Sequence, residues 1–373
     1  MTRAAAMRGA HIAKRVLFFV ARHTGALALT RRSRWRNRRL LILGYHSVSL
    51  EDEHLWSPTY SATIANMQRR FKAIKRNRCT VLPLMEAIEM LRSGELPERS
   101  VAITFDDGLF DFKERAYPLL KSNGFPATVF LQTSYCLFNR PVFDCVCSYL
   151  LWKGRGARLR LGEVLGHGQE AIDLSSVPAR QAAMRAIKNA AQPLTIQERD
   201  DLARRSAQSL GVDYDELCGK RVLTLLRPSE VQWLSRNGVD FQLHTHAHCM
   251  PPERAALMRE IERNRAEIRA MTGRTPSHLC YPGGVYDARF LPWLRDAGVA
   301  SASTCDPGLA GPATNPLLLP RIIDTCLSPV STFAAWLTGF AHPFRSRSPA
   351  FTEAPAFPAP GSHSHASAAG AGH

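Results

Sequence analysis

The sequence predicts an α/β protein in which helices alternate with the strands of a parallel sheet or barrel. Short apolar runs of strand length recur along the chain, separated by segments with helical spacing of apolar residues. Two of these runs end in polar clusters, one at Asp106-Asp107-Gly108 and one at residues 244–248. Functional residues of parallel α/β proteins lie at the carboxyl ends of strands, so both clusters are expected on one side of the fold.

The first half of the ordered chain reads as repeated strand and helix units. The apolar spacing of Ile64, Met67, Phe71 and Ile74 predicts a helix, and Gly94 and Asn123-Gly124 end two more. The predicted strands are 40–48, 79–82, 101–105 and 127–132, and the later two helices are 84–91 and 115–122. This alternation favours parallel strands over hairpins.

The alternation lapses at about 134–227, where arginine- and alanine-rich, helix-prone sequence predicts a helical insertion. It then returns, with Ser229 as the expected N-cap of the next helix. The predicted helices are 230–236, 253–271, 290–297 and 332–339, and the predicted strands are 239–243, 278–281, 300–304 and a last unit at 317–323. Residues 343–373 are rich in Pro, Ala, Ser and Gly and are predicted to be a disordered tail.

Residues 1–39 form a basic N-terminal arm. Of the formal net charge of +16, all but five charges come from basic residues of this arm, and no acidic residue occurs before Glu51. The remainder is too weakly charged to indicate a nucleic-acid-binding protein, so we expect no nucleic acid partner. An anionic membrane surface explains the arm better, through peripheral association of residues 1–39.

The apolar segment 16–21 (VLFFVA) within the arm is too short to span a bilayer. It is followed by an arginine run at 31–39 where a signal peptide would have its cleavage region, so no export signal is predicted. Two interpretations remain open, an interfacial helix and a helix that packs on the domain. The nine cysteines are odd in number and scattered, which is typical of reduced thiols. We therefore expect a cytoplasmic, membrane-associated protein.

The two polar clusters together contain the parts of a hydrolytic metal centre. Asp107, His244 and His248 offer a carboxylate and two imidazoles, a ligand set typical of catalytic zinc, and Asp106 can act as the general base. Gly108 would let the backbone pass close to the metal. Taken singly, Asp-Asp-Gly could be a turn and the histidines a surface cluster. Because each follows a strand signal, the pair favours a divalent metal site, most simply for zinc.

The order of these motifs resembles that of the polysaccharide deacetylases, the carbohydrate esterase family that includes chitooligosaccharide and peptidoglycan deacetylases. Residues 104–108 (TFDDG) look like the first family motif and 244–248 (HTHAH) match the second. The resemblance extends over roughly 40–340, with looser matches at 44–48, 281–284 and 319–322. It implies a distorted (β/α) barrel with fewer than eight units, and a catalytic domain at 40–342 interrupted by the insertion.

The resemblance also assigns roles to residues. It implies that Asp106 is the catalytic base, that Asp107, His244 and His248 bind the metal, and that His246 is not a ligand. Tyr281, Pro282 and Gly283 would line the substrate groove, with a backbone amide holding the oxyanion.

Two departures from the family pattern stand out. The third motif lacks the arginine that orients the catalytic carboxylate, and Arg321 could replace it. The late histidine that serves as general acid has no match, since His342 lies close to the tail. The acid is therefore unassigned: His46 is a weak candidate, and a metal-bound water could serve instead.

The function implied is metal-dependent removal of an N-acyl group, most simply acetyl, from an amino sugar of a polysaccharide, oligosaccharide or lipid-linked glycan, as in exopolysaccharide biosynthesis. An N-acetylated glycan would be the substrate. One alternative is a non-catalytic glycan-binding descendant of the same fold. Another is an amidohydrolase that uses His244 and His246 as its metal pair, although that class places the pair on an early strand.

Overall fold

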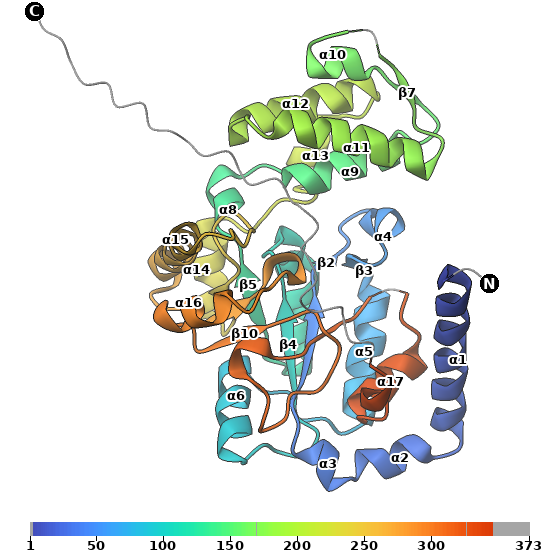
Figure 1. Ribbon diagram of the computed structural model, residues 1–373, viewed down its shortest axis with the longest axis vertical. Helices are drawn as coiled ribbons and strands as arrows, with labels where there is room; N and C mark the ends of the chain where they lie inside the picture. The colour runs from blue at the N-terminus through green and yellow to red at the C-terminus, as the bar shows by residue number, and fades with distance from the viewer. Residues whose placement is uncertain (1–2, 169, 326, 346–373) are drawn as a thin grey trace, which may run out of the picture. The chain divides into compact units, whose positions relative to one another are not determined.

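The computed structural model describes residues 3–168, 170–325 and 327–345. Its central sheet has seven parallel strands in the order β10-β9-β8-β5-β4-β1-β11 (Figure 1). These strands are β1 (Leu41–Tyr45), β4 (Val101–Phe105), β5 (Thr128–Leu131), β8 (Asp240–Leu243), β9 (His278–Cys280), β10 (Ser301–Ser303) and β11 (Ile322–Ile323). Because β10 and β11 are the edges of the sheet and do not pair with each other, the barrel is not closed. The fold is therefore a distorted (β/α) barrel with fewer than eight units, as predicted.

The strands form where the sequence is apolar without interruption. Both β1 and β4 are buried along their whole length, which is typical of parallel strands covered on both faces. The predicted strand at 79–82 is wrong, because only Val81 pairs, in one bridge to Val101. This segment is half-exposed, and Pro83 directly after it is the N-cap of the next helix. A two-stranded sheet of β2 (Ser47–Val48) and β3 (Ser61–Ala62) follows β1.

Helices cover the sheet largely where apolar spacing predicts them. In α5 (Ile64–Arg76), Met67, Phe71 and Ile74 are fully buried, and the Thr63 side chain caps the first turn by accepting from the Asn66 N–H. The others beside the sheet are α4 (Glu53–Trp56), α6 (Leu84–Ser93), α7 (Tyr117–Asn123), α8 (Ser134–Phe138), α14 (Pro228–Arg236), α15 (Arg254–Thr272), α16 (Phe290–Asp296) and α17 (Val330–Leu337). Ser229 is not the N-cap of α14, because the helix begins one residue earlier, at Pro228.

The basic arm folds into α1 (Arg3–His23), α2 (Ala26–Arg31) and α3 (Arg34–Asn37). One face of α1 packs on α17, with Phe18 and Ala21 buried in an apolar cluster with Ala335 and Ala341. Its other face exposes Val16, Leu17, Phe19 and Val20. Within the described residues, no helix is both long and apolar enough to cross a membrane.

A second compact unit covers residues 143–216 and is helical. It contains α9 (Phe143–Lys153), α10 (Leu161–Leu165), α11 (Val177–Ala191), α12 (Ile196–Ser209), the start of α13 (Tyr214–Gly219), and a small sheet of β6 (Arg158–Leu159) and β7 (Ile172–Asp173). Its own core forms where α11 and α12 pack on α9, with Leu150, Ile187 and Leu202 buried.

The unit is shorter than the insertion predicted at 134–227. Residues 134–142 and 217–227 belong with the sheet, because Pro141 pairs with Thr224 and Leu109 with Leu225. Of the predicted disordered tail, residues 346–373 lie outside the described residues.

Candidate metal centre and active site

The two adjacent carboxylates, Asp106 and Asp107, directly follow β4 at the carboxyl end of the sheet. The N–H of Asp106 still donates to the Tyr45 carbonyl (2.8 Å), and the chain then turns through Asp107 (φ 68°) and Gly108 (φ 81°). A Cβ at Gly108 would collide with the Leu131 side chain. Gly108 is therefore required by the close approach of β5, which is a more specific reason than the predicted approach to a metal.

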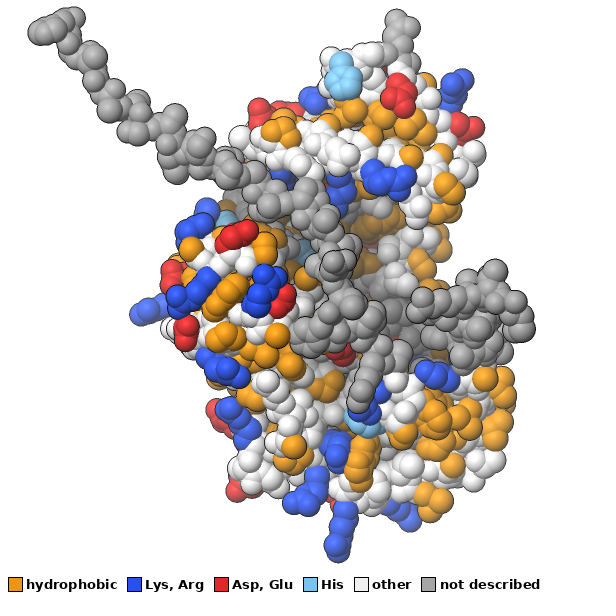
Figure 2. Space-filling model, viewed as in Figure 1, with side chains coloured by type: hydrophobic (Ala, Val, Ile, Leu, Met, Phe, Trp, Pro, Cys, Tyr) orange, Lys and Arg blue, Asp and Glu red, His pale blue; other side chains and the backbone are white. Residues whose placement is uncertain are grey.

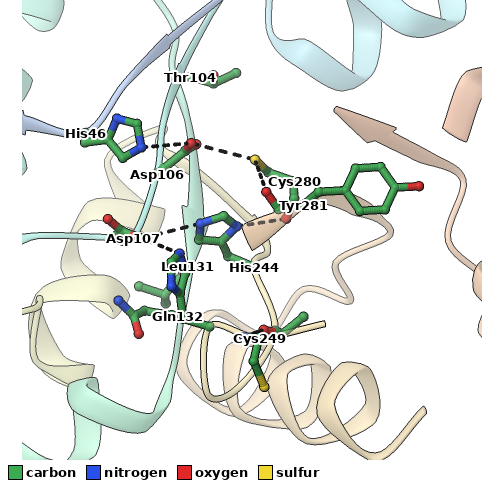
Figure 3. Close-up of polar contacts among 12 residues, drawn as sticks. His46, Thr104, Asp106, Asp107, Leu131, Gln132, His244, Cys249, Cys280 and Tyr281 are labelled. Carbon is green, nitrogen blue, oxygen red and sulfur yellow. Dashed lines mark hydrogen bonds and ion pairs between the residues drawn. The ribbon is translucent and has the colours of Figure 1, made fainter. Parts of the chain in front are cut away.

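The three predicted ligands converge at this end of the sheet. The Oδ1 atom of Asp107 lies 3.4 Å from Nε2 of His244 (Figure 3). The same oxygen lies 3.2 Å from Nε2 of His248. One ligand atom from each residue falls within 4.8 Å of the others. Burial alone raises the pKa of Asp107, but the two neighbouring imidazoles outweigh it and hold that pKa well below its usual range. The carboxylate is therefore charged.

The donor set fits a divalent cation. Oδ2 of Asp107 accepts a hydrogen bond from the Tyr60 hydroxyl (2.7 Å), whereas the buried Oδ1 has no hydrogen-bond partner among the described residues. Nδ1 of His244 is 2.8 Å from the Cys280 carbonyl, which can only accept, so Nδ1 carries a proton and Nε2, which faces Asp107, is the nitrogen that a metal could bind. An orphaned carboxylate oxygen beside an available imidazole lone pair is what a metal site requires.

Arg321 holds the predicted base. Its Nη1 and Nη2 donate to Oδ1 and Oδ2 of Asp106, each at 2.6 Å, and both side chains are buried. Burial raises the pKa of Asp106, but the charge and hydrogen bonds of Arg321 outweigh it and keep that pKa below its usual value. A Cβ at Gly44 would lie 3.1 Å from the Arg321 guanidinium carbon, so this glycine leaves room for the pair.

A second group of possible ligands consists of Asp106, His244 and Cys280. It shares His244 with the first group, and both oxygens of Asp106 are already engaged by Arg321. Burial raises the pKa of the Cys280 thiol well above its ordinary value, so the sulfur is protonated. The set of Asp107, His244 and His248 is therefore the better metal site.

Three further residues lie near Asp106 and Asp107, and two of them, Tyr60 and Asp111, have no motif of their own in the sequence. Tyr60 contacts Asp107 through its hydroxyl, and its ring lies 4.9 Å from that of His46. Nε2 of His46 lies 3.6 Å from Oδ2 of Asp106. Asp111 accepts from the Ser47 hydroxyl (2.6 Å) and the Val48 N–H (3.1 Å), and so fixes the segment just after His46.

The third predicted motif lies partly away from the centre. The Tyr281 ring points away from the metal ligands (Figure 3), and its hydroxyl donates to the Leu317 carbonyl (2.9 Å). Its N–H donates to the Ser303 carbonyl (3.1 Å), so Tyr281 does not supply the expected oxyanion amide. Pro282 has no N–H. Gly283 is then the one residue of the three whose N–H could serve.

His246 is turned away from the ligands. The Thr133 hydroxyl accepts from the Asn264 side-chain amide (3.1 Å) and is hydrogen-bonded to Nδ1 of His246 (2.9 Å). Burial lowers the pKa of His246 to about 4, which agrees with a neutral ring. An amidohydrolase-type pair of His244 and His246 does not form.

A family model described as polysaccharide deacetylase matches residues 93–144 and 196–302. The break between the two matched segments falls within the helical unit. Curated relatives include the poly-beta-1,6-N-acetyl-D-glucosamine N-deacetylases of Staphylococcus aureus and Staphylococcus epidermidis, each 36% identical over 76 residues. The match covers 20% of this chain and 26% of the relatives, so the chain spans about a quarter of their length.

Solved structures share the fold over most of the chain. A Streptococcus pyogenes deacetylase, PplD, in complex with acetate has a TM-score of 0.52 at 16% identity, covering 79% of this chain and 96% of that one. IcaB from Ammonifex degensii has a TM-score of 0.50 at 16% identity, covering 80% and 97%.

Proposed function

Because this chain belongs to the polysaccharide deacetylase family, we propose that it is a metal-dependent hydrolase that removes N-acetyl groups from amino sugars of a glycan. The observation that carries the proposal is the single cluster formed by the metal ligands Asp107, His244 and His248 with the Asp106–Arg321 pair. The curated relatives act on poly-beta-1,6-N-acetyl-D-glucosamine. A polymer of N-acetylglucosamine, as in exopolysaccharide biosynthesis, is the substrate to test first.

Asp107, His244 and His248 would hold a divalent ion, most simply zinc, through one oxygen and two Nε2 atoms. When bound, such an ion supplies Lewis acidity that polarises the amide carbonyl and activates water. The protein's part is to keep one oxygen of Asp107 free for it, because Tyr60 occupies the other. The Cys280 carbonyl fixes the His244 ring in the tautomer that a metal needs.

Asp106 would take the proton of the attacking water. Since Arg321 keeps this carboxylate ionised and bonds both of its oxygens, the base is available over a wide pH range and its orientation is set. The lowered pKa makes Asp106 a weak base on its own, so this proposal requires that the water is itself activated.

His46 would return a proton to the leaving amine. Its Nε2 lies 3.6 Å from Asp106, and Tyr60 packs against its ring. A base and an acid on the same side of the ligand cluster can pass a proton from the attacking water to the departing nitrogen within one site. His342, the other histidine considered, instead accepts from the Leu309 N–H (3.1 Å) beside the loop before β11.

Metal content and acetate release test this function together. We expect about one transition-metal ion per purified full-length chain, its loss in His248→Ala, and acetate release from N-acetylglucosamine oligomers. Asp106→Asn should keep the metal and lose turnover. Unchanged hydrolysis in Asp106→Asn would refute its role as base. No metal in the wild type, even after incubation with zinc, would remove the mechanism and favour the glycan-binding alternative.

We also propose that the arm binds an anionic membrane at the cytoplasmic face. The outer face of α1 is apolar, with Val16 56% and Phe19 58% exposed, and Leu29 of α2 is 78% exposed. Figure 2 shows hydrophobic side chains gathered at the lower right, where Figure 1 draws α1 and α17. Arg15, Arg22 and the run at 31–39 flank this face and complement acidic headgroups. The cysteines of the described residues are free thiols, which fits a reducing compartment.

Vesicle sedimentation checks the membrane proposal. Phe19→Ser with Val20→Ser should lower co-sedimentation with phosphatidylglycerol vesicles, because these side chains are exposed and do not stabilise the packing on α17. Leu55→Ser, which removes an equally exposed apolar side chain from α4, is the matched control. Equal sedimentation of the two variants would refute the proposal.

A further inference from the structure

The segment 244–248, called the histidine loop here, has an unfavourable backbone. Two of its residues, Thr245 (φ 59°) and His248 (φ 56°), adopt the left-handed conformation. A left-handed backbone is rare for residues other than glycine, and rarer still for a β-branched residue such as threonine. Such a conformation persists only where surrounding groups hold it.

Two side chains of α15 hold the loop through its backbone. Oδ1 of Asn264 accepts from the His244 N–H (3.0 Å), and Oε2 of Glu260 accepts from the Ala247 N–H (2.7 Å). Glu260 and Asn264 are four residues apart, so they lie on one face of the helix. The helix α15 thus provides one hydrogen-bond acceptor near each end of the strained segment, Asn264 for the His244 N–H and Glu260 for the Ala247 N–H.

The Asn264 amide also connects the histidine loop to β5. Its Nδ2 donates to the Leu131 carbonyl (2.9 Å) and to the Thr133 hydroxyl (3.1 Å). With the bond from the His244 N–H, this fully buried side chain makes three hydrogen bonds, all to groups around the site. The N–H of Gln132, the residue directly after β5, donates to the Asp107 carbonyl (3.3 Å). The Asn264 side chain therefore links the histidine loop to the end of β5. That end of β5 is in turn hydrogen-bonded to the loop of residues 106–111, called the carboxylate loop here.

We propose that Asn264, together with Glu260, is a positioning residue for the metal: it sets metal affinity by holding the histidine loop in its strained ligand geometry. This inference rests on the proposed metal site of Asp107, His244 and His248. Neither residue touches the ligand atoms, and both act through the backbone. Loss of such outer partners typically lowers metal affinity about 10- to 100-fold.

The test is a Zn²⁺ competition titration against a chromogenic chelator on the full-length chain. The metal-free melting temperature of each variant is measured alongside. Asn264→Ala and Glu260→Ala should each bind Zn²⁺ at least about 10-fold more weakly than the wild type. Glu260→Gln keeps an oxygen acceptor for the Ala247 N–H and should stay within about threefold of the wild type, which tests the hydrogen bond rather than the charge.

Ile268→Ala is the matched control for lost stability. Ile268 is one turn further along α15 and fully buried, but it makes no hydrogen bond to the loop. This variant should lower the metal-free melting temperature and leave Zn²⁺ affinity unchanged. If Ile268→Ala loses as much affinity as Asn264→Ala, affinity merely follows stability and the inference is wrong. If Asn264→Ala does not fold, Glu260→Ala against Glu260→Gln decides alone.

The outcomes also distinguish a failure of the positioning role from a failure of the proposed metal site. A wild type that binds Zn²⁺ in a His248-dependent way, with Asn264→Ala and Glu260→Ala unchanged, overturns the positioning role and leaves the metal site standing. A wild type that binds no Zn²⁺ overturns the metal site and the inference together.

Discussion

The two loops that carry the predicted metal ligands are held in different ways. In the loop after β4, residues 106–111, the carboxylates of Asp106 and Asp107 are bonded by side chains far away in the sequence, Arg321 and Tyr60, in addition to the backbone hydrogen bonds of the loop. The histidine loop after β8 is fixed through its backbone N–H groups by the next helix. Substitutions around the first loop therefore change the balance of charge, whereas those around the second change geometry.

The largest effect is expected where a buried charge loses its partner. Arg321→Met should lower the free energy of unfolding by about 3–5 kcal/mol, because Asp106 is left buried without compensation. Urea denaturation measures the loss. Combining it with Asp106→Asn should restore much of the stability, since the unpaired charge is gone. A loss below about 1 kcal/mol in the single variant would show that the carboxylate loop does not depend on charge balance.

Metal binding should stabilise the fold, because the proposed ion takes ligands from both loops. With Zn²⁺ at about 100 times its dissociation constant, the wild type should gain about 2.7 kcal/mol in unfolding free energy, and a chelator should reverse the gain. His248→Ala should show no gain, because it removes one ligand of the set. Thermal melts with and without Zn²⁺ provide the comparison. Equal stabilisation of wild type and variant would mean that the ion binds elsewhere.

A smaller effect is expected from the hydrogen bond on Asp107. Tyr60→Phe frees Oδ2, so the carboxylate is less well oriented and Zn²⁺ affinity should fall about 10-fold. The competition titration measures it. Tyr117→Phe, whose hydroxyl bonds the distant Asn237 carbonyl (3.3 Å), is the control. An unchanged affinity would mean that side-chain partners matter less for this loop than backbone partners do for the other.

The last expected effect depends on pH and concerns Asp111, at the end of the carboxylate loop. Burial raises its pKa to about 7, although Ser47 and Val48 donate hydrogen bonds to it. The unfolded value is about 3.9, so between about pH 4 and 7 the folded state keeps a proton that the unfolded state has lost. This contribution to stability is complete below about pH 4 and is lost as the pH rises through about 7.

Asp111→Asn removes that titration while keeping the shape of the side chain. Relative to the variant, the wild type should lose up to about 1.4 kcal/mol per pH unit across this window, measured by urea denaturation at several pH values. A difference that does not change with pH would mean that Asp111 is ionised throughout in the folded protein.

The convergence of the proposed metal ligands could be predicted because both sequence signals are local. Each polar cluster directly follows an apolar strand, and parallel strands bring such ends together, so the sequence alone predicts that Asp107 and His248 lie near each other. Arg321 could be named as a candidate but not assigned, because its contact with Asp106 joins residues more than 200 positions apart.

Tyr60, Asn264 and Glu260 carry no signal of their own. Tyr60 lies in a short irregular stretch, and the two α15 residues are ordinary in a charged helix. Their roles follow from where tertiary packing puts them. The strand predicted at 79–82 failed for a similar reason, since local apolar character does not decide whether a neighbouring strand extends far enough to pair.

The helical unit at 143–216 leaves the sheet and returns to it at one place. Pro141 pairs with Thr224, and the Val142 N–H donates to the Leu223 carbonyl (2.9 Å), so the outgoing and returning chains run side by side. The family model is also interrupted here, between residues 144 and 196. A junction of this kind is modular: its ends already meet as a short antiparallel connection, so in evolution or engineering the unit can be lengthened, exchanged or replaced by a turn while the strands keep their register.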